Sequence, residues 1–177
     1  MIDVKNLFPE CFADTLLVHL IKGWGYPNHR HGISDVNKAL KQREDFNNVL
    51  IGIVDLDKAK NIAENKHLIK FTEIIANKKG QDEELILKKL PDKEHYVIFV
   101  NKEFEHWIWK QADLVGIDKS EYGFNTIEDL YRVSKHYRTS ENSESGRRFK
   151  RFVNSVVIAN PAGVALLRKW IVDNEFI

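Results

Sequence analysis

Three pairs of acidic residues are the side chains of this sequence best suited to chemistry. They are Glu10 with Asp14, Asp55 with Asp57, and Glu103 with Glu105. Carboxylates that lie close together repel one another, so their pKa values rise unless a cation compensates the charge. A cluster that offers only oxygen ligands favours a hard divalent cation, and the pattern therefore indicates Mg²⁺ or Mn²⁺. Each pair taken alone also fits a structural role, because Asp is common where strands end and Glu is common in the first turn of helices.

Apolar runs precede these acids and identify the strands that would position them. Residues 49–54 form a continuous apolar run that leads into Asp55, and residues 96–100 form a second run just before Glu103. Runs of this kind are typical of strands buried at the centre of a parallel sheet. A shorter strand is expected over residues 2–8, before the first acidic pair. Because ligands of open α/β sheets bind beyond the carboxyl ends of the strands, we expect the three pairs to meet at one edge of the sheet.

Helical patterns fill the segments between the predicted strands. Helices are expected over residues 12–21, from Ile33 onward and over 58–79. Ser34 or Asp35 is available as an N-cap for the second of these helices. A fourth strand is expected over residues 85–90, where an apolar segment ends at Pro91. The alternation of strands and helices predicts an α/β fold, with a mainly parallel central sheet of about four strands flanked by helices.

The last third of the chain has helical patterns and no strand pattern. Asn160 is expected to cap a closing helix over residues 162–172, with Pro161 at its start. We therefore divide the chain into an α/β domain over residues 1–115 and a helical C-terminal extension over residues 116–177, packed on that domain.

Composition limits the class of protein. The 177 residues are 43% hydrophobic, which is enough for a substantial core. No run approaches the roughly 20 consecutive apolar residues of a membrane span, and the first residues lack the pattern of a signal peptide. Cys11 is the single cysteine, so the chain cannot form an internal disulfide. We expect a soluble, cytoplasmic protein with no membrane partner.

The net charge of +1 conceals a basic stretch near the C-terminus. Seven Lys or Arg residues in this stretch stand against only Glu141 and Glu144. The seven are Arg132, Lys135, Arg138, Arg147, Arg148, Lys150 and Arg151. Basic clusters contact the phosphate backbone of nucleic acids, and the alternative is an ordinary solvated surface. We expect nucleic acid as a partner, bound through these seven residues.

Other candidate residues lie in loops. His29 and His31 flank Arg30 in a loop that could present imidazole and guanidinium groups to a phosphate. Lys102, which follows a predicted strand, could also bind phosphate, and Trp24 in its glycine-rich turn could stack on a base. The alternative for the histidines is simple exposure to solvent, and for Trp24 a place in the core.

Three stretches of the sequence resemble, in order, the motifs of TOPRIM domains. They are Pro9-Glu10-Cys11-Phe12-Ala13-Asp14, the strand that ends in Asp55-Leu56-Asp57, and Asn101-Lys102-Glu103-Phe104-Glu105-His106-Trp107. The last stretch is similar to the N-x-x-F-E-x-W pattern of small stand-alone TOPRIM-like proteins of bacterial defence systems, including the RloB-like group. OLD-family nucleases share the broader domain. The resemblance covers residues 1–114 and leaves the last third unassigned.

The resemblance implies a metal-dependent nuclease or phosphotransfer protein that acts on nucleic acid, with a place in phage defence. It implies that Asp55 and Asp57 bind Mg²⁺ or Mn²⁺, and that Glu10 binds metal or acts as general acid or base. Asp14 corresponds to a further metal-binding acid, and Glu105 adds a further catalytic acid. In this family the metal polarises a phosphoryl oxygen and lowers the pKa of an attacking water. The alternative is a non-catalytic TOPRIM-like interaction module that works with a partner protein such as an ATPase.

Overall fold

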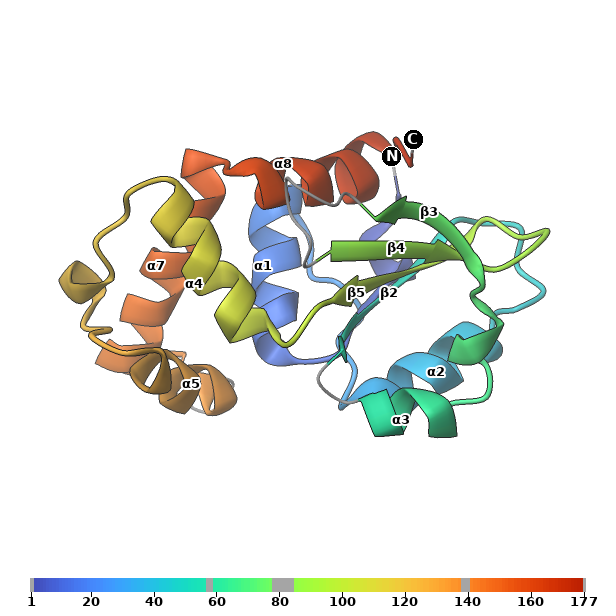
Figure 1. Cartoon of the computed structure of the whole chain (residues 1–177), viewed down its shortest axis with the longest axis horizontal. Coiled ribbons are helices and arrows are strands. Elements are labelled where there is room, and N and C mark those ends of the chain that lie inside the picture. Colours follow the sequence, from blue (N-terminus) through green and yellow to red (C-terminus); the bar gives the residue numbers. More distant parts are fainter. Residues whose placement is uncertain (1, 57–58, 78–84, 138–140, 177) are drawn as a thin grey trace.

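The protein has an α/β fold in which helices cover both faces of a five-stranded sheet (Figure 1). The computed structural model describes residues 2–56, 59–77, 85–137 and 141–176. The strands, in their order across the sheet, are Leu7–Pro9 (β1), Leu50–Asp55 (β2), His95–Val100 (β5), Leu85–Lys89 (β4) and Glu73–Asn77 (β3). Strands β1, β2 and β5 are parallel, whereas β4 and β3 continue the sheet in antiparallel pairing. The sheet is therefore mixed.

The register of the parallel strands brings their carboxyl ends to one edge. Pro9 at the end of β1 pairs with Ile53, and Asp55 at the end of β2 pairs with Val100 at the end of β5. All six residues of β2 and of β5 are buried, as expected for strands covered on both faces. Glu10 directly follows β1 and Asp55 ends β2, so the prediction of a common sheet edge is confirmed for these two acids.

One face of the sheet packs against most of the helices. They are Phe12–Lys22 (α1), Phe104–Leu114 (α4), Ile127–Lys135 (α5), Glu144–Ala159 (α7) and Ala162–Arg168 (α8). Ile51, Ile53 and Ile98 of the sheet share one apolar cluster with Leu17 of α1 and Trp107 of α4, both of which are buried. Figure 1 shows α1 between the sheet and the other helices, and α8 running across the top of the molecule in that view.

The opposite face of the sheet packs against a smaller layer of helices, Ile33–Lys41 (α2), Ala59–Glu64 (α3) and the 3₁₀ helix Leu68–Lys70. Gly52 in the middle of β2 explains how closely α2 approaches. A Cβ atom at Gly52 would lie 2.9 Å from Val36 Cγ1 and 3.0 Å from Leu40 Cδ1, closer than van der Waals contact allows. The missing side chain of Gly52 therefore makes room for α2 on the sheet.

The C-terminal helices continue the core of the first face. Phe149, Phe152 and Val156 of α7 are buried in the cluster that contains the sheet residues, and α7 contacts both α1 and α4. The start of α5 is fixed by a capping box between Thr126 and Asp129, a local signal that stabilises helix starts. The predicted boundary at residues 115 and 116 falls just after α4 and stays a prediction.

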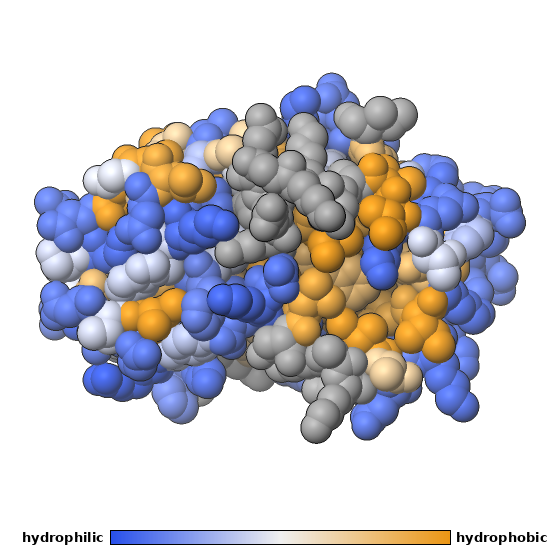
Figure 2. All heavy atoms as spheres, viewed as in Figure 1, coloured by the Kyte–Doolittle hydropathy of each residue, from blue (hydrophilic) through white to orange (hydrophobic). Residues whose placement is uncertain are grey.

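Two predictions about the sheet are wrong. The sequence predicts one long helix over residues 58–79, but that stretch contains the short α3, the 3₁₀ helix Leu68–Lys70 and strand β3. The sheet also has five strands rather than about four, with β4 and β3 antiparallel. Strand β3 is short, lies at the sheet edge with Ile74 exposed to solvent, and is flanked in sequence by charged residues that are typical of a surface helix. Figure 2, drawn in the same view as Figure 1, shows apolar residues at the surface in the region where β3 and β4 lie.

Predictions of helix ends are also corrected in two places. The N-cap of α2 is Gly32, with no side-chain hydrogen bond, instead of Ser34 or Asp35. Asn160 does not start the closing helix, because it ends α7 in the left-handed conformation with φ of 51°. Pro161 takes the N-cap position, and the predicted helix over 162–172 divides into α8 and a π-helical segment, Lys169–Asp173.

The helices can be compared with the length and apolar character that a membrane span requires. Among the described residues, no single helix has both the length and the apolar character of a membrane span. The helix pair Glu144–Ala159 and Ala162–Asp173, bent by 85°, passes the same test of length and composition only when taken together.

Candidate functional site

The first two strands bring Glu10 and Asp55 into direct contact. The backbone N–H of Glu10 donates to the carbonyl of Ile53 at 3.0 Å, so the β1–β2 pairing continues into the residue that follows β1. The backbone N–H of Asp55 in turn donates to Glu10 Oε2 at 3.1 Å. Both residues are buried, Glu10 at 2% exposure and Asp55 at 7%. The sheet edge thus holds two acidic residues, distant in sequence, in fixed positions.

Asp14 joins them from the first turn of α1. The N-cap of α1 is Cys11, whose N–H and thiol both lie within hydrogen-bonding distance of Asp14 Oδ2, at 3.3 and 3.1 Å. Burial raises the pKa of Asp14 to about 7, and the charges of Glu10 and Glu105 add to the shift against the opposing hydrogen bonds from Cys11. Burial, together with the charges of Asp14 and Asp55, also raises the pKa of the Cys11 thiol well above its usual range. The thiol is therefore a hydrogen-bond donor here and not a thiolate nucleophile.

Glu105 enters the site from the first turn of α4. It is buried, and its carboxylate accepts a hydrogen bond from the hydroxyl of Ser134 on α5. Glu103, the N-cap of α4, lies 3.3 Å from the ring nitrogen of His106, which also contacts the hydroxyl of Tyr131 on α5 at 3.0 Å. Glu105 therefore links α4 to α5 directly, and Glu103 does so through His106. Both acids also line the cavity at the sheet edge.

The segment from Pro27 to Gly32 forms the opposite wall. The N–H of Arg30 donates to the carbonyl of Pro9 at 2.9 Å, and the N–H of Gly32 donates to the carbonyl of Glu10 at 3.1 Å, so this loop runs beside the end of β1. His29 stacks on Phe12 with ring centroids 3.7 Å apart. The His31 ring lies edge-on to His29 at 4.8 Å.

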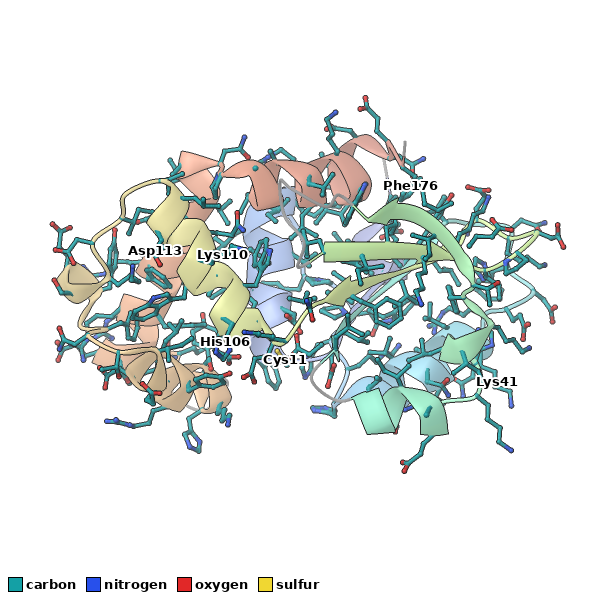
Figure 3. The ribbon with its side chains drawn as sticks, viewed as in Figure 1. Cys11, Lys41, His106, Lys110, Asp113 and Phe176 are labelled. Carbon is teal, nitrogen blue, oxygen red and sulfur yellow. The ribbon has the colours of Figure 1, made fainter. Side chains whose placement is uncertain are left out.

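These walls enclose a cavity of about 500 Å³ at the carboxyl edge of the sheet. Glu10, Asp55, Glu103 and Glu105 line its acidic side, and His29, Arg30, His31 and Lys135 bring nitrogen donors to it. Figure 3 shows Cys11, which also lines the cavity, at the start of α1, and His106 in the first turns of α4. The cavity therefore places carboxylates beside groups that can neutralise an anion, an arrangement suited to a substrate that carries phosphate.

Carboxylate oxygens are ligands of the kind that Mg²⁺ and Mn²⁺ prefer. Glu10, Asp14, Asp55 and Glu105 are buried near this edge of the sheet, and the charges of Glu10 and Glu105 help to raise the pKa of Asp14. Within the described ranges, no group of three or more His, Cys, Asp or Glu side chains converges closely enough to hold a metal ion. Asp57, which was predicted as a ligand, lies outside the described residues. The residues that fit a cation by type and position are Glu10 and Asp55.

Six of the seven predicted nucleic-acid-binding residues are described, and they are spread over three hollows. Lys135 lines the cavity described above. Arg132 and Arg148 line a second hollow of about 370 Å³ beside Gly123. The remaining described members, Arg147, Lys150 and Arg151, line a third hollow of about 490 Å³, and Arg138 lies outside the described residues.

Some residues of the site have no signal in the sequence, and some predicted ones lie elsewhere. Ser134, the partner of Glu105, belongs to a helix whose sequence pattern is merely amphipathic. Phe12, which orients His29, occupies a position that a helical pattern assigns to the core. Lys102 is exposed, has a φ of 64° and does not line the cavity, and Trp24 is half-exposed beside Lys22. Sequence periodicity places side chains on a helix face, but cannot say which loop or second helix they meet.

Comparison of the chain with protein-family models, with curated proteins and with solved structures finds no match. The resemblance to TOPRIM domains therefore rests on the three motifs and their order.

Proposed function

We propose that the cavity is a Mg²⁺- or Mn²⁺-dependent centre of TOPRIM type that cleaves phosphodiester bonds or transfers phosphoryl groups in nucleic acid. The observation that carries the proposal is the contact between Glu10 and Asp55 at the ends of two parallel strands, in a cavity that also holds Arg30 and Lys135. A role in phage defence belongs to the same proposal and derives from the resemblance to TOPRIM-like defence proteins.

The carboxylates on the sheet edge have the role of holding the cation. Asp55 and Glu10 would bind it together with Asp57, and the bound ion would supply Lewis-acid activation of a phosphoryl oxygen and of water. Asp14 fixes the start of α1 through its capping box with Cys11, and it lies close enough to Glu10 for the charge of Glu10 to raise its pKa. Glu105, positioned by Ser134, is the acid on the α4 side of the cavity and would accept or deliver a proton at the substrate.

The basic groups have the role of binding phosphate. Arg30 and Lys135 reach the cavity from different elements, so they would contact oxygens on opposite sides of a phosphodiester. His29 is fixed by its stack on Phe12 and by the hydroxyl of Thr15, 3.0 Å from its ring nitrogen. A fixed imidazole beside a phosphate can donate to the leaving oxygen, which assigns His29 a positioning or proton-donating role.

The test is metal binding and hydrolysis measured on the same preparations. Titration calorimetry with Mn²⁺ and Mg²⁺ should show binding to the wild type and none to an Asp55→Asn/Asp57→Asn double variant. Metal-dependent hydrolysis of oligonucleotides should fall by about 100-fold or more in that variant, the contribution of a well-positioned catalytic group. An Asp45→Asn/Asp173→Asn variant removes two exposed acids elsewhere and should retain both properties. Equal binding and hydrolysis in the two double variants would contradict the proposal.

A second candidate function is a non-catalytic TOPRIM-like module that works with a partner protein such as an ATPase. The observation that favours it is the internal bonding of the acids. Glu10 accepts from the Asp55 N–H, Asp14 from Cys11, and Glu105 from Ser134. Acids used in this way stabilise the fold without any ligand. Absence of metal binding by the wild type, combined with capture of an ATPase subunit in a stable complex, would favour the module.

A further inference from the structure

A row of aromatic rings follows the outer side of α1 away from the cavity. At the start of the helix, Phe12 stacks on His29. About two turns later, His19 stacks on Tyr26 with centroids 4.2 Å apart and an angle of 2° between the ring planes. The His19 ring also contacts the carbonyl of Gly25, so the loop after α1 runs back along the helix. Tyr26 is 70% exposed, and it therefore offers solvent the ring face that His19 does not cover.

A basic groove continues along the same side of α1. Leu20 forms its apolar part, and one face of α7 lines it with Arg147, Lys150 and Arg151 against a single acid, Glu144. The groove volume is about 490 Å³. The three basic side chains are exposed and sit at helical spacing, so their positive charges face the solvent above an apolar surface.

The cavity, the stacked rings and the groove lie in sequence along one helix. Phe12 lines the cavity, His19 stacks on Tyr26, and Leu20 lines the groove. Eight residues of α-helix separate Phe12 from Leu20, a length of roughly 12 Å. The exposed ring of Tyr26, stacked on His19, therefore lies along α1 between the residue that lines the cavity and the residue that lines the groove.

We propose that this side of α1 binds a single-stranded polynucleotide, with a base stacked on Tyr26, phosphates on Arg147, Lys150 and Arg151, and the strand leading into the cavity. The inference builds on the proposed function, because it names the form of nucleic acid that reaches the same site. Exposed rings flanked by basic side chains are the combination used to bind single strands, where the ring stacks on bases and the charges follow the backbone.

The same features argue against a duplex as the ligand. A base in a duplex is stacked on both faces by its neighbours, so a single exposed ring gains nothing from it unless the duplex opens. The positive charge complements a polyanion, and Leu20, the apolar residue that lines the groove, can contact an unpaired base but not a base stacked inside a duplex.

The experiment is a binding measurement in EDTA, where metal-dependent cleavage cannot occur. Fluorescence anisotropy would compare labelled oligo(dT), oligo(U) and a blunt duplex of the same length, which also separates DNA from RNA. Single strands should bind more tightly than the duplex. Tyr26→Ala should weaken single-strand binding by about 5- to 100-fold, the usual range for losing one stacked base, and Tyr26→Phe should retain it. Phe46→Ala, which removes a 50% exposed ring elsewhere, is the matched control and should change nothing.

The positive charges are tested through the salt dependence of binding. Arg147→Ala/Arg151→Ala should reduce the slope of log affinity against log salt by about 0.7 for each phosphate that the variant no longer neutralises. Lys38→Ala/Lys41→Ala removes two exposed positive charges from α2, which lies away from α1 in Figure 3, and should leave the slope unchanged. Equal affinity for duplex and single strand, equal effects of Tyr26→Ala and Phe46→Ala, or displacement of the oligonucleotide by polyglutamate would overturn the inference.

Failure of this inference can be told apart from failure of the proposed function. Hydrolysis of the small phosphodiester bis(p-nitrophenyl) phosphate with Mn²⁺ needs the cavity but no strand along α1. Tyr26→Ala should leave it unchanged, whereas Asp55→Asn should abolish it. Single-strand binding with no hydrolysis of the small diester would reject the proposed function alone, and hydrolysis without the Tyr26 effect would reject the inference alone.

Discussion

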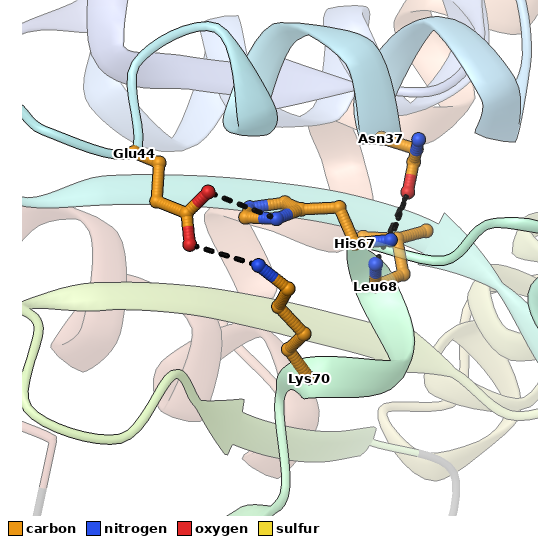
Figure 4. A network of polar contacts seen from close by, with 5 residues as sticks. All are labelled: Asn37, Glu44, His67, Leu68 and Lys70. Carbon is orange, nitrogen blue, oxygen red and sulfur yellow. Dashed lines mark hydrogen bonds and ion pairs between the residues drawn. The ribbon is translucent and has the colours of Figure 1, made fainter.

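Charged and polar side chains gather at two places beside the sheet, and the two groups are of opposite character. Beside the cavity at the carboxyl edge of the sheet, Asp14 lies near Glu10 and Glu105, and burial, helped by these like charges, raises its pKa to about 7. On the other side of the sheet, Glu44 lies 3.0 Å from Lys70 and 3.7 Å from the ring of His67 (Figure 4). There the hydrogen bond from Lys70, followed by the charges of His67 and Lys70, lowers the pKa of Glu44.

The difference lies in the charge of the neighbouring groups. Around Glu44, the carboxylate has Lys70 as a cationic neighbour, and Asn37 accepts hydrogen bonds from the N–H groups of His67 and Leu68 at 3.0 and 3.1 Å. Around Asp14, the carboxylates have hydrogen bonds but their charges repel. Uncompensated buried charge is costly for folding, so a site that retains it is a candidate for binding a cation or a proton in function.

The largest expected contrast is in activity. Glu10→Gln should lower metal-dependent hydrolysis by about 100-fold, because it removes a charge from the proposed metal-binding pair. Glu44→Gln should leave hydrolysis unchanged and alter the free energy of unfolding by at most about 1 kcal/mol, since its ion pair with Lys70 is partly exposed. Initial rates and urea unfolding of the two variants would measure this. Similar rates in both would remove the distinction between the two networks.

The next contrast is in stability. Asn37→Ala would leave the N–H groups of His67 and Leu68 without their acceptor, at a cost of about 1–3 kcal/mol in the free energy of unfolding. Asn37→Asp keeps an acceptor oxygen and serves as the matched variant, with a smaller loss. Neither should affect hydrolysis after correction for folded protein. A loss of activity in Asn37→Asp at full stability would show that the two networks are coupled.

The smallest contrast is in pH dependence, where the two networks have opposite signs. The pKa of Asp14 is raised from 3.8 to about 7, so the folded state holds a proton that the unfolded state loses, and stability should fall as pH rises from 3.8 to about 7. Burial lowers the pKa of His67 from 6.5. The contribution of His67 to the free energy of unfolding is therefore present above pH 6.5 and is lost as pH falls below it. Urea unfolding at several pH values, without metal, should show the first slope disappear in Asp14→Asn and the second weaken in His67→Gln. Unchanged slopes in these variants would assign the pH dependence to other groups.

Much of the site could be predicted because its framework is local and repetitive. The apolar runs before Asp55 and Glu103 identify β2 and β5 directly, and parallel strands present their carboxyl ends on one side. The helix that begins after Cys11 follows from its apolar periodicity. These signals depend only on neighbouring residues, and they place the acids near the sheet edge without any knowledge of the strand order.

The rest of the site depends on contacts between segments far apart in sequence. The loop that carries His29 and Arg30 faces Glu10 only because its backbone bonds to the end of β1, and Ser134 meets Glu105 only because α5 packs on α4. The charged stretch that contains β3 becomes a strand through hydrogen bonds to β4, which no local pattern encodes. The basic residues look contiguous in sequence but lie in three hollows, because α5 and α7 turn them in different directions.

The sequence by itself determined the class of fold, the central parallel strands and the positions of Glu10 and Asp55 at their ends, because apolar periodicity and strand direction are local properties. The tertiary structure alone decided which groups surround those acids. It brought Ser134 of α5 into contact with Glu105, closed the cavity with the His29–Gly32 loop and left Tyr26 exposed beside α1. Such contacts follow from how helices and loops pack on the sheet, and packing depends on the whole chain.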